Sequence, residues 1–529
     1  MNASATVGGG LPGRIALWLL VLPLLLPLLL LGLAWFEAQP ETWEHLRRHV
    51  LGPVTRDTLT LGALVAVGVS LLGVPLAWLS AHCEYPGRRW LDWGLVLPLA
   101  MPTYVVAFAW VGLLDYAGPL QSAWRALSGS RGELLEARGI GLAAVLLSLV
   151  LYPYVYLLAR AAFLRQGAAA FDAARTLGRS PWQAFAGIAL PMIRPAWAVG
   201  AGLAVLETLA DFGAVSILGV DTFTTAIYKT WYALFALPAA AQLASLLLLA
   251  VASVLLIERA LRGRASHRPP GMRPMPRLQL RGARGWLASG FAIAVLLAGF
   301  AIPALRLLDW ALATSPAWAS LAQLAGNTLL LGLMVAVAVT VLALVIAGAE
   351  FRAPQDRWRR AAAFVATLGY AIPGTVLAVA VMLLLLRAEA VIDRAFGWQW
   401  ALSASLLGVV PALLLRFLRV GHGALEAGFA QLRPSLFESA RLLGAGRWRR
   451  LTAIALPQLR PSLLVALLLV LVETMKEMPA TLMLRPFGWD TLAVRIYAYT
   501  SEGLWADAAW PALLLVAVGL LPVWLLGRR

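Results

Sequence analysis

Long apolar runs alternate with short polar segments along almost the whole of this 529-residue chain. A stretch of about 20 apolar residues can cross a bilayer as a helix, so each run predicts a membrane-spanning helix. A helix is expected because the backbone of such a run finds no water in lipid and must satisfy its own polar groups. About twelve such runs are present, at 14–36, 57–80, 91–115, 139–164, 196–218, 234–260, 285–309, 326–349, 361–386, 401–422, 462–484 and 508–526.

One polar segment between these runs occurs twice. Residues 171–195 read FDAARTLGRSPWQAFAGIALPMIRP, and residues 437–461 read FESARLLGAGRWRRLTAIALPQLRP. The copies align without a gap at an offset of 266 residues (437 minus 171). Each copy follows the fourth apolar run of its half, so the two halves are predicted to share one architecture and to run in the same direction through the membrane. Parallel repeats of this kind pack around a pseudo-twofold axis and place a pathway at their interface.

The repeat divides the chain into a first half of residues 1–258, a linker of residues 259–284 and a second half of residues 285–529. Each half is predicted to hold six helices. Shorter matches support the division, namely Thr58-Leu59 with Thr328-Leu329, Pro102 with Pro373, and Asp221-Thr222 with Asp490-Thr491. The last of these pairs is expected near the outer ends of two helices, either as helix N-caps or in a short helix that contacts a binding protein.

Composition excludes a soluble globular protein, because 61% of the residues are hydrophobic and only 13% are charged. The net charge of +17 reflects orientation in the membrane rather than nucleic-acid binding. If the N-terminus is cytoplasmic, loops on that side hold about 27 Lys and Arg against about 11 on the other side, as the positive-inside rule requires. The arginine-rich linker would then lie inside, against anionic headgroups. We therefore expect an all-α polytopic protein of the bacterial inner membrane with both termini in the cytoplasm.

The repeated segment, which we call the docking loop, has the features of a surface that a partner contacts. Asp172 and Glu438 stand near the expected start of a helix, where a carboxylate suits the positive end of the helix dipole. Small residues follow each acid and would let a partner approach the backbone closely. These are Ala173, Ala174, Ser439 and Ala440.

Glycine and proline positions predict how each docking loop folds. Gly178 and Gly444 come six residues after the acid and can end the first helix in a left-handed turn. A second short amphipathic piece follows, and Pro191 or Pro457 is expected to stop it. The prediction is a short helix, a turn and a second helix, braced against the cytoplasmic ends of the bundle. An ordinary helical hairpin is the plain alternative, which the matched second copy disfavours.

The pattern of acid, Ala or Ser, Ala, then Gly, then I-x-L-P resembles the E-A-A motif of the inner-membrane permeases of ATP-binding-cassette importers. The resemblance covers essentially the whole chain and implies two parallel six-helix repeats of the type I importer fold. In that family the loop forms a coupling helix that sits in a groove of the ATPase subunit. Most such permeases carry one motif and dimerise, so this chain resembles the fused branch. It departs from the motif mildly, by Asp at 172 and Ser at 439.

The chain itself is not expected to hydrolyse ATP or to bind a cofactor. Its only lysines are Lys229 and Lys476, and neither follows a glycine, so the sequence holds no phosphate-binding loop. The resemblance implies that ATP is bound by two copies of a separate ATPase, and that a periplasmic binding protein delivers the cargo. The mechanism it implies is alternating access, in which ATPase movement reaches the helices through the docking loops.

The amino-acid sequences of residues 207–231 and 473–497 resemble those of the iron(III) permeases of this class. Ferric iron is therefore the expected cargo, with thiamine or another small organic solute as the alternative. An ion-coupled secondary transporter is a less favoured reading, because it would not need paired docking loops. A membrane enzyme is disfavoured because no cluster of His, Asp or Ser marks an active site.

Charged residues within the apolar runs are costly and usually functional. Glu207 matches Glu473 and Asp211 matches Glu477 at the same 266-residue offset. The spacing of i and i+4 would place each acid pair on one helix face, and Lys476 lies beside the second pair. These five residues are candidates for the translocation pathway, since a hard cation prefers oxygen ligands. The alternative is structural, with Lys476 paired to a neighbouring acid and the other acids holding loops. A full metal site is not expected, because a transporter should not bind its cargo tightly.

Overall fold

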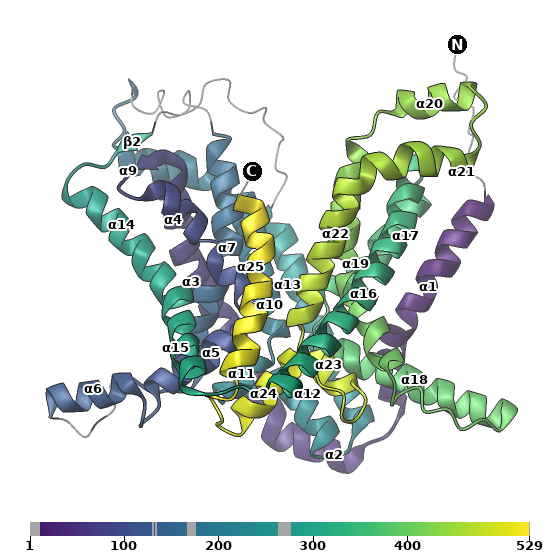
Figure 1. Ribbon diagram of the computed structural model, residues 1–529, viewed down its shortest axis with the longest axis horizontal. Coiled ribbons are helices and arrows are strands. Elements are labelled where there is room, and N and C mark those ends of the chain that lie inside the picture. The colour runs from purple at the N-terminus through teal and green to yellow at the C-terminus, as the bar shows by residue number, and fades with distance from the viewer. Residues whose placement is uncertain (1–10, 130–131, 133–134, 167–175, 263–276, 528–529) are drawn as a thin grey trace. The chain divides into compact units, whose positions relative to one another are not determined.

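The computed structural model describes residues 11–129, 132, 135–166, 176–262 and 277–527. Figure 1 shows that these residues are almost entirely helical. Eleven of the described helices are long and apolar enough to cross a membrane. A shorter apolar helix over Ala509–Pro522 lies where the twelfth was expected. The described residues thus confirm an all-α polytopic fold.

The labels η mark short 3-10 or π-helical turns. The first half of the sequence forms α1 (Leu11–Leu33), η1 (Ala34–Phe36), α2 (Pro40–His45), η2 (Leu46–Val50), α3 (Leu51–His82), β1 (Cys83–Glu84), α4 (Arg88–Gly94), η3 (Leu97–Ala100), α5 (Thr103–Leu114), α6 (Pro119–Ser128), α7 (Ile140–Leu164), α9 (Pro181–Ala184), η4 (Phe185–Ala189), α10 (Leu190–Ala210), α11 (Gly213–Ile217), α12 (Phe223–Tyr232) and α13 (Leu237–Arg262). The remainder forms β2 (Leu278–Gln279), α14 (Ala283–Leu296), η5 (Leu297–Ala301), α15 (Ile302–Ala313), α16 (Trp318–Arg352), α17 (Arg357–Ala366), η6 (Leu368–Ala371), α18 (Gly374–Phe396), α19 (Leu406–Ala430), α20 (Pro434–Leu442), α21 (Arg447–Arg450), η7 (Leu451–Ala455), α22 (Leu456–Lys476), α23 (Pro479–Leu484), α24 (Leu492–Ser501) and α25 (Ala509–Gly527).

The chain forms two compact units whose boundaries differ from those of the sequence halves. One unit combines the segment up to Ala38, Ala236–Ser245 and Trp318–Val494. The other combines Gln39–Phe235, Leu246–Ala317 and the segment from Arg495 onward. Most helices of each unit therefore come from one half of the sequence, and the others come from the opposite half.

Helices α3, α7 and α10 form the centre of the unit that starts at Gln39. Their close packing depends on small residues, as is usual for helices in lipid. A Cβ atom added to Gly73 of α3 would meet the Val155 side chain of α7 at 2.7 Å, and one added to Gly200 of α10 would meet the Val155 Cα atom at 2.8 Å. Val155 is thus held between two glycines from flanking helices.

Helices α16, α19 and α22 form the equivalent centre of the other unit. A Cβ atom on Gly421 of α19 would meet Val339 of α16 at 2.7 Å, and one on Gly332 of α16 would meet Leu471 of α22 at 2.8 Å. These helices occupy the same positions in the order of the second half as α3, α7 and α10 occupy in the first. The predicted repeat is therefore visible as two similar three-helix cores.

The first spanning helix of each half packs on the other half. Helix α1 contacts α17 and α18, whereas α14 contacts α4 and α15 contacts α5. In Figure 1 the purple α1 runs beside the green α17, and the teal α14 runs beside the dark blue α4. Helix α1 is apolar on nearly all sides, so its own sequence does not specify which neighbour it should cover.

Two of the expected continuous helices are broken at equivalent places. The run 91–115 is divided into α4, η3 and α5, and the run 361–386 into α17, η6 and α18. Pro102 and Pro373 precede α5 and α18 with nearly identical backbone angles, φ −58° and ψ 144° against φ −55° and ψ 143°. Proline fixes φ and removes a hydrogen-bond donor, so each one begins a helix rather than continuing one.

The far end of the linker is fixed to the first half. Residues 263–276 lie outside the described part of the chain. Beyond them, β2 pairs in parallel with β1, with Cys83 opposite Leu278, and the Leu280 amide donates to the Glu84 carbonyl at 3.0 Å. The Ser289 hydroxyl donates to the Pro86 carbonyl at 2.7 Å. These bonds hold the start of α14 against the α3–α4 turn.

Candidate docking loops and helix-end carboxylates

The second docking loop folds as a short helix, a turn and a second helix. Helix α20 ends in the two hydrogen bonds of a Schellman motif, from the Gly444 amide to the Arg441 carbonyl at 3.0 Å and from the Ala445 amide to the Ala440 carbonyl at 2.9 Å. Gly444 has φ of 77°, a conformation that glycine adopts without steric cost. The predicted left-handed turn is confirmed here.

Glu438 lies in the second turn of α20, because this helix begins at Pro434. The expectation that Glu438 stands near a helix start is therefore wrong, and the helix dipole does not explain its presence. Glu438 and Ser439 are exposed and Ala440 is half-buried. The acid and the serine thus lie on the exposed surface of α20.

In the first docking loop Asp172, Ala173 and Ala174 lie outside the described residues. Gly178 is described and has φ of 72°, close to the value at Gly444. The leucine before each glycine is strongly exposed, Leu177 at 79% and Leu443 at 87%. A large apolar side chain thus occupies the same exposed place in both copies.

Pro191 and Pro457 do not stop a helix, contrary to expectation. The spanning helices run without a break over Phe185–Ala210 and Trp448–Lys476. Each proline is the second residue after a π-helical turn, which is η4 in the first copy and η7 in the second. The wider turn accommodates a residue that cannot donate a hydrogen bond and would otherwise clash with the preceding turn. Each docking loop therefore continues directly into a spanning helix.

Aromatic side chains join each docking loop to the helices beside it. In the second copy the Phe351 ring of α16 lies 5.5 Å from the Phe437 ring of α20 and 5.2 Å from the Phe429 ring of α19, between centroids.

In the first copy the Trp78 ring of α3 lies 4.8 Å from Phe185 of η4 and 5.2 Å from Phe163 of α7, between centroids. Phe163 and Phe429 are related by the 266-residue offset. The same position of the repeat thus supports both loops, and the Gln166 amide adds a bond of 3.0 Å to the Ala189 carbonyl in the first copy.

The helices that leave the docking loops end at the candidate pathway acids. Helix α10 ends at Ala210 and α22 at Lys476, so Asp211 and Glu477 have extended backbone and do not continue the helix. The expectation that each acid pair shares one helix face is therefore wrong.

Asp211 holds the start of the next short helix. One of its carboxylate oxygens accepts from the Val215 amide of α11 at 3.1 Å, and the other accepts from the Thr103 hydroxyl of α5 at 2.5 Å. The Asp211 carbonyl accepts from the Thr224 hydroxyl of α12 at 2.6 Å. One residue thus joins α10, α11, α5 and α12.

Glu477 has the same role in the second half. Its carboxylate accepts from the Ala480 amide at 2.9 Å and from the Thr481 amide and hydroxyl at 3.1 Å and 2.8 Å. The Arg416 guanidinium of α19 lies 3.9 Å away. Because Glu477 is only 6% exposed, these donors replace the water that a buried carboxylate loses.

The remaining charged candidates lie in the helix ends. Glu473 is 46% exposed at its side chain, and its carboxylate lies 3.2 Å from the Lys476 ammonium, as the structural alternative predicted. Glu207 is half-buried in α10. Among the described residues no three His, Cys, Asp or Glu side chains are grouped as a metal site would require.

Thr103 and Gly374 belong to this arrangement and were not foreseen. Gly374 follows Pro373 as Thr103 follows Pro102. A Cβ atom on Gly374 would lie 2.7 Å from a Glu477 carboxylate oxygen. The shorter Asp211 therefore meets a threonine, and the longer Glu477 meets a glycine. We call this difference between the halves, Thr103 with Asp211 against Gly374 with Glu477, the exchange of sizes. Aligning the two copies at Pro102 and Pro373 could have revealed it.

The threonine pairs of the repeat also coincide in structure. The Thr58 hydroxyl accepts from the Phe223 amide at 3.2 Å, and the Thr328 hydroxyl accepts from the Leu492 amide at 2.8 Å. Thr222 forms a capping box at the start of α12. The N-cap interpretation is thus confirmed for Thr222.

Comparisons with known proteins agree with the duplicated geometry. Residues 73–266 and 340–528 each match the family described as "Binding-protein-dependent transport system inner membrane component". An Fe(3+)-transport system permease protein of Haemophilus influenzae is 26% identical over 537 residues, covering 98% of this chain and 99% of the relative. A sulfate transport system permease protein of Escherichia coli is 28% identical over 236 residues, covering 44% and 83%. A molybdenum transport system permease protein of Escherichia coli is 31% identical over 160 residues, covering 30% and 67%.

Proposed function

The chain belongs to the family of inner-membrane components of binding-protein-dependent transport systems, and on this premise we propose that it is the permease subunit of an ATP-driven importer of ferric iron. In this proposal both halves of the transmembrane pathway come from one polypeptide. Two copies of a cytoplasmic ATPase bind the two docking loops, and a periplasmic binding protein delivers the cargo. Both termini lie in the cytoplasm, and ATP is bound only by the partner subunits.

The observation that carries the proposal is the continuous path from each docking loop to a carboxylate that holds the start of the next short helix. In the second half, one helix runs over Trp448–Lys476, and Glu477 at its end holds the start of α23. In the first half, one helix runs over Phe185–Ala210, and Asp211 holds the start of α11. A movement imposed on a loop would therefore reach the short helices through a rigid element and a hydrogen-bonded end, as a two-state coupling requires.

The exposed apolar residues of the docking loops suit an ATPase groove. Leu442, Leu443 and Trp448 are 89%, 87% and 75% exposed, and burying such side chains against a partner would contribute about 1.5–3 kcal/mol each. The chain lacks a phosphate-binding loop of its own. An external ATPase that docks at these residues would supply the energy for alternating access.

Ferric iron is favoured as cargo because a relative that aligns with nearly the whole chain is an Fe(3+) permease. The sulfate and molybdenum relatives align with less than half of the chain. Asp211 and Glu477 use their oxygens to hold helices, so the pathway need not retain iron in a cage. Weak, transient contact is what conduction of a strongly binding cation requires.

The proposal is tested by radiolabelled uptake in cells that lack their own high-affinity iron systems. The chain is expressed with its ATPase and binding protein, and thiamine and sulfate are supplied in parallel. Iron uptake that needs all three components supports the proposal. Uptake of thiamine or sulfate instead would reject the cargo, and uptake without the ATPase would reject the importer class.

A matched pair of glycine variants tests the docking role. Gly444→Asp is expected to abolish uptake while the protein still inserts. Gly503→Asp is the control, because Gly503 also has a left-handed backbone, with φ of 76°, and open space at its Cβ position, but lies between α24 and α25. Equal loss of uptake in both variants would indicate backbone strain alone and would contradict the docking role.

A further inference from the structure

We propose that a recess between α1 and α17 binds one anionic phospholipid, with an acyl chain along α1 and the headgroup at the arginines that begin α17. The recess lies wholly within the unit that contains α1 and α17. None of its lining residues belongs to the docking loops or to the helix-end carboxylates.

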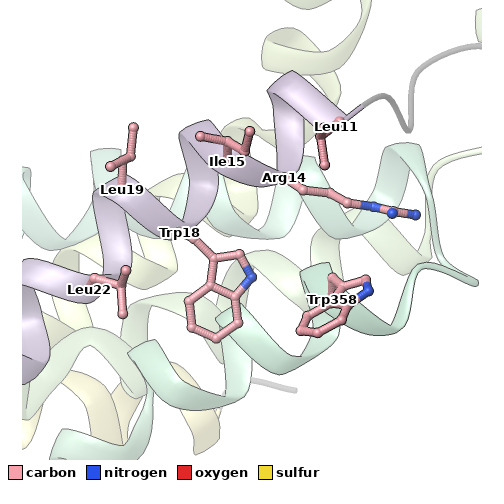
Figure 2. Close-up of a pocket in the computed structure, with 7 residues that line it drawn as sticks. All are labelled: Leu11, Arg14, Ile15, Trp18, Leu19, Leu22 and Trp358. Atoms are coloured by element: carbon pink, nitrogen blue, oxygen red, sulfur yellow. The ribbon is translucent and has the colours of Figure 1, made fainter.

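The recess has a volume of about 630 Å³ and a lining that is almost entirely apolar. Figure 2 shows the lining residues, which are Leu11, Arg14, Ile15, Trp18, Leu19 and Leu22 of α1 and Trp358 of α17. The α1 residues recur at intervals of three and four, so they form one face of the helix. The buried residues of α1 are Leu17, Val21, Pro27 and Leu31. The face of α1 that lines the recess thus differs from the face that packs on the protein, and lipid would reach it.

Charge gathers at the end of the recess where α17 begins. Arg14 contacts Asp356 at 2.8 Å, and Arg359 contacts the same carboxylate at 3.5 Å. Arg359 also donates to the Ala349 carbonyl at 2.9 Å. Asp356 is therefore shared by two buried or half-buried arginines, and it leaves the local charge positive.

Arg357 and Arg360 add two further positive charges and are both exposed. They are three residues apart on a helix and so lie on neighbouring positions of its surface. The Arg357 guanidinium lies 5.7 Å from the centre of the Trp358 ring, which lines the recess. The cationic side chains thus stand at the edge of the apolar groove.

An anionic phospholipid combines the two features that this place requires. Its acyl chain suits an apolar groove along a membrane-spanning helix, and its phosphate suits a cluster of arginines at the interface. A zwitterionic lipid would bring a cationic group toward the same arginines. A bound lipid would also fill the space between α1 and α17. It would thereby hold α1, which belongs to the first half of the sequence, against the helices of the second half.

Native mass spectrometry of the purified full-length protein tests the headgroup part of the proposal. Phosphatidylglycerol is expected to be retained in preference to phosphatidylcholine with the same acyl chains. Arg357→Gln and Arg360→Gln together should weaken phosphatidylglycerol retention by about 5-fold for each arginine. Arg357→Lys and Arg360→Lys should keep most of it, which guards against misfolding as the cause.

Arg89→Gln is the matched control, because Arg89 is exposed beside the exposed Trp90 of α4 in the first half. Equal retention of the two lipids, or an equal effect of Arg89→Gln and the double variant, would overturn the proposal in favour of general surface attraction. The measurement does not involve transport, so its outcome is independent of the proposed function.

The acyl-chain part is tested by filling the groove without changing charge. Leu19→Trp should reduce phosphatidylglycerol retention, and phosphatidylglycerol with brominated chains should quench tryptophan fluorescence in the wild type more than in Trp358→Phe. Val67→Trp is the control, since Val67 is exposed on α3 and does not line the recess. Unchanged retention in Leu19→Trp, or equal quenching with and without Trp358, would show that the lipid does not occupy this recess.

Discussion

The Glu477 carboxylate accepts two hydrogen bonds from Thr481, one from its backbone amide at 3.1 Å and one from its hydroxyl at 2.8 Å. This relationship fixes α23 to the end of α22, the helix that continues from the second docking loop. Asp211 repeats the amide bond in the first half, where its carboxylate accepts from the Val215 amide at 3.1 Å. Asp211 and Glu477, two of the four acids that the sequence marks as pathway candidates, thus cap the short helices that follow them.

Glu477→Gln should destabilise the protein by about 1–2 kcal/mol, since it weakens a helix cap and leaves buried donors with one good acceptor. Glu473→Gln is the control and should change stability by less than about 0.5 kcal/mol, because Glu473 is half-exposed and its ion pair with Lys476 is worth little. The thermal midpoint of the purified protein measures both. A larger loss in Glu473→Gln would contradict the capping role.

The parts of this arrangement that sequence could predict are those set by local backbone demands. The left-handed turns at Gly178 and Gly444 follow from a glycine after a short helix. The breaks at Pro102 and Pro373 were missed, because the apolar runs predicted unbroken helices there, although proline fixes φ and cannot donate a hydrogen bond. The matched threonines Thr58 and Thr328 show that comparing the two copies also locates contacts between distant segments.

The parts that sequence could not predict depend on tertiary packing. Helix α1 is apolar nearly all round, so nothing local indicates that it covers α17 and α18. The ends of α10 and α22 were missed because Asp211 and Glu477 fit a helical spacing until their partners in the following helix are known. The coupling role of the docking loops and the pathway role of Glu207 and Lys476 stay predictions.

Cys83 should be nearly inert to alkylation in the folded protein. It is 2% exposed, and burial raises the pKa of its thiol from 9.0 to about 11. Two pKa units reduce the thiolate fraction at pH 8 by about 100-fold. Iodoacetamide labelling at pH 8 should therefore be at least about 100-fold slower than for a free thiol, and denaturant should restore it.

The raised thiol pKa also gives the sign of its contribution to stability. The contribution of the protonated Cys83 thiol to the free energy of unfolding is fully present below pH 9 and is lost as pH rises through about 11. It is lost because the thiol of the unfolded chain releases its proton at a lower pH than the buried thiol does. Rapid labelling of the native protein at pH 8 would mean that the β1–β2 contact opens freely.

Asp356 should make the attachment of α1 sensitive to acid. The hydrogen bond from Arg14 lowers the pKa of the Asp356 carboxyl below 3.8, and the Trp358 amide and the charge of Arg359 act in the same direction. A lowered pKa in the folded state means that the contribution is present above pH 3.8 and is lost as pH falls through the lowered value. Asp356→Asn should therefore reduce the thermal midpoint between pH 5 and pH 8 and make no difference in strong acid.

Asp393→Asn is the control for this measurement, because Asp393 is exposed on α18. It should leave the midpoint unchanged at every pH. A constant difference between the wild type and Asp356→Asn down to the lowest pH would show that the side chain acts through its shape rather than its charge.

The exchange of sizes between the halves predicts a compensating pair of substitutions. Gly374→Thr should destabilise the protein by about 1–3 kcal/mol, because its Cβ atom would lie 2.7 Å from the Glu477 carboxylate. Glu477→Asp should also destabilise, since the shorter side chain withdraws from Thr481. The two changes together recreate the pairing of Thr103 with Asp211, whose hydroxyl and carboxylate are 2.5 Å apart.

The double variant should therefore recover about 1–2 kcal/mol relative to the sum of the single variants, as residues in direct contact do. Thermal midpoints of the four proteins give this coupling energy. Gly326→Thr is the control for the added side chain, because a Cβ atom there meets open space, and Gly326→Thr with Glu477→Asp should show simple additivity. Additive losses in the Gly374 pair would mean that the two halves reach the same geometry by unrelated packing, and that the size exchange is incidental.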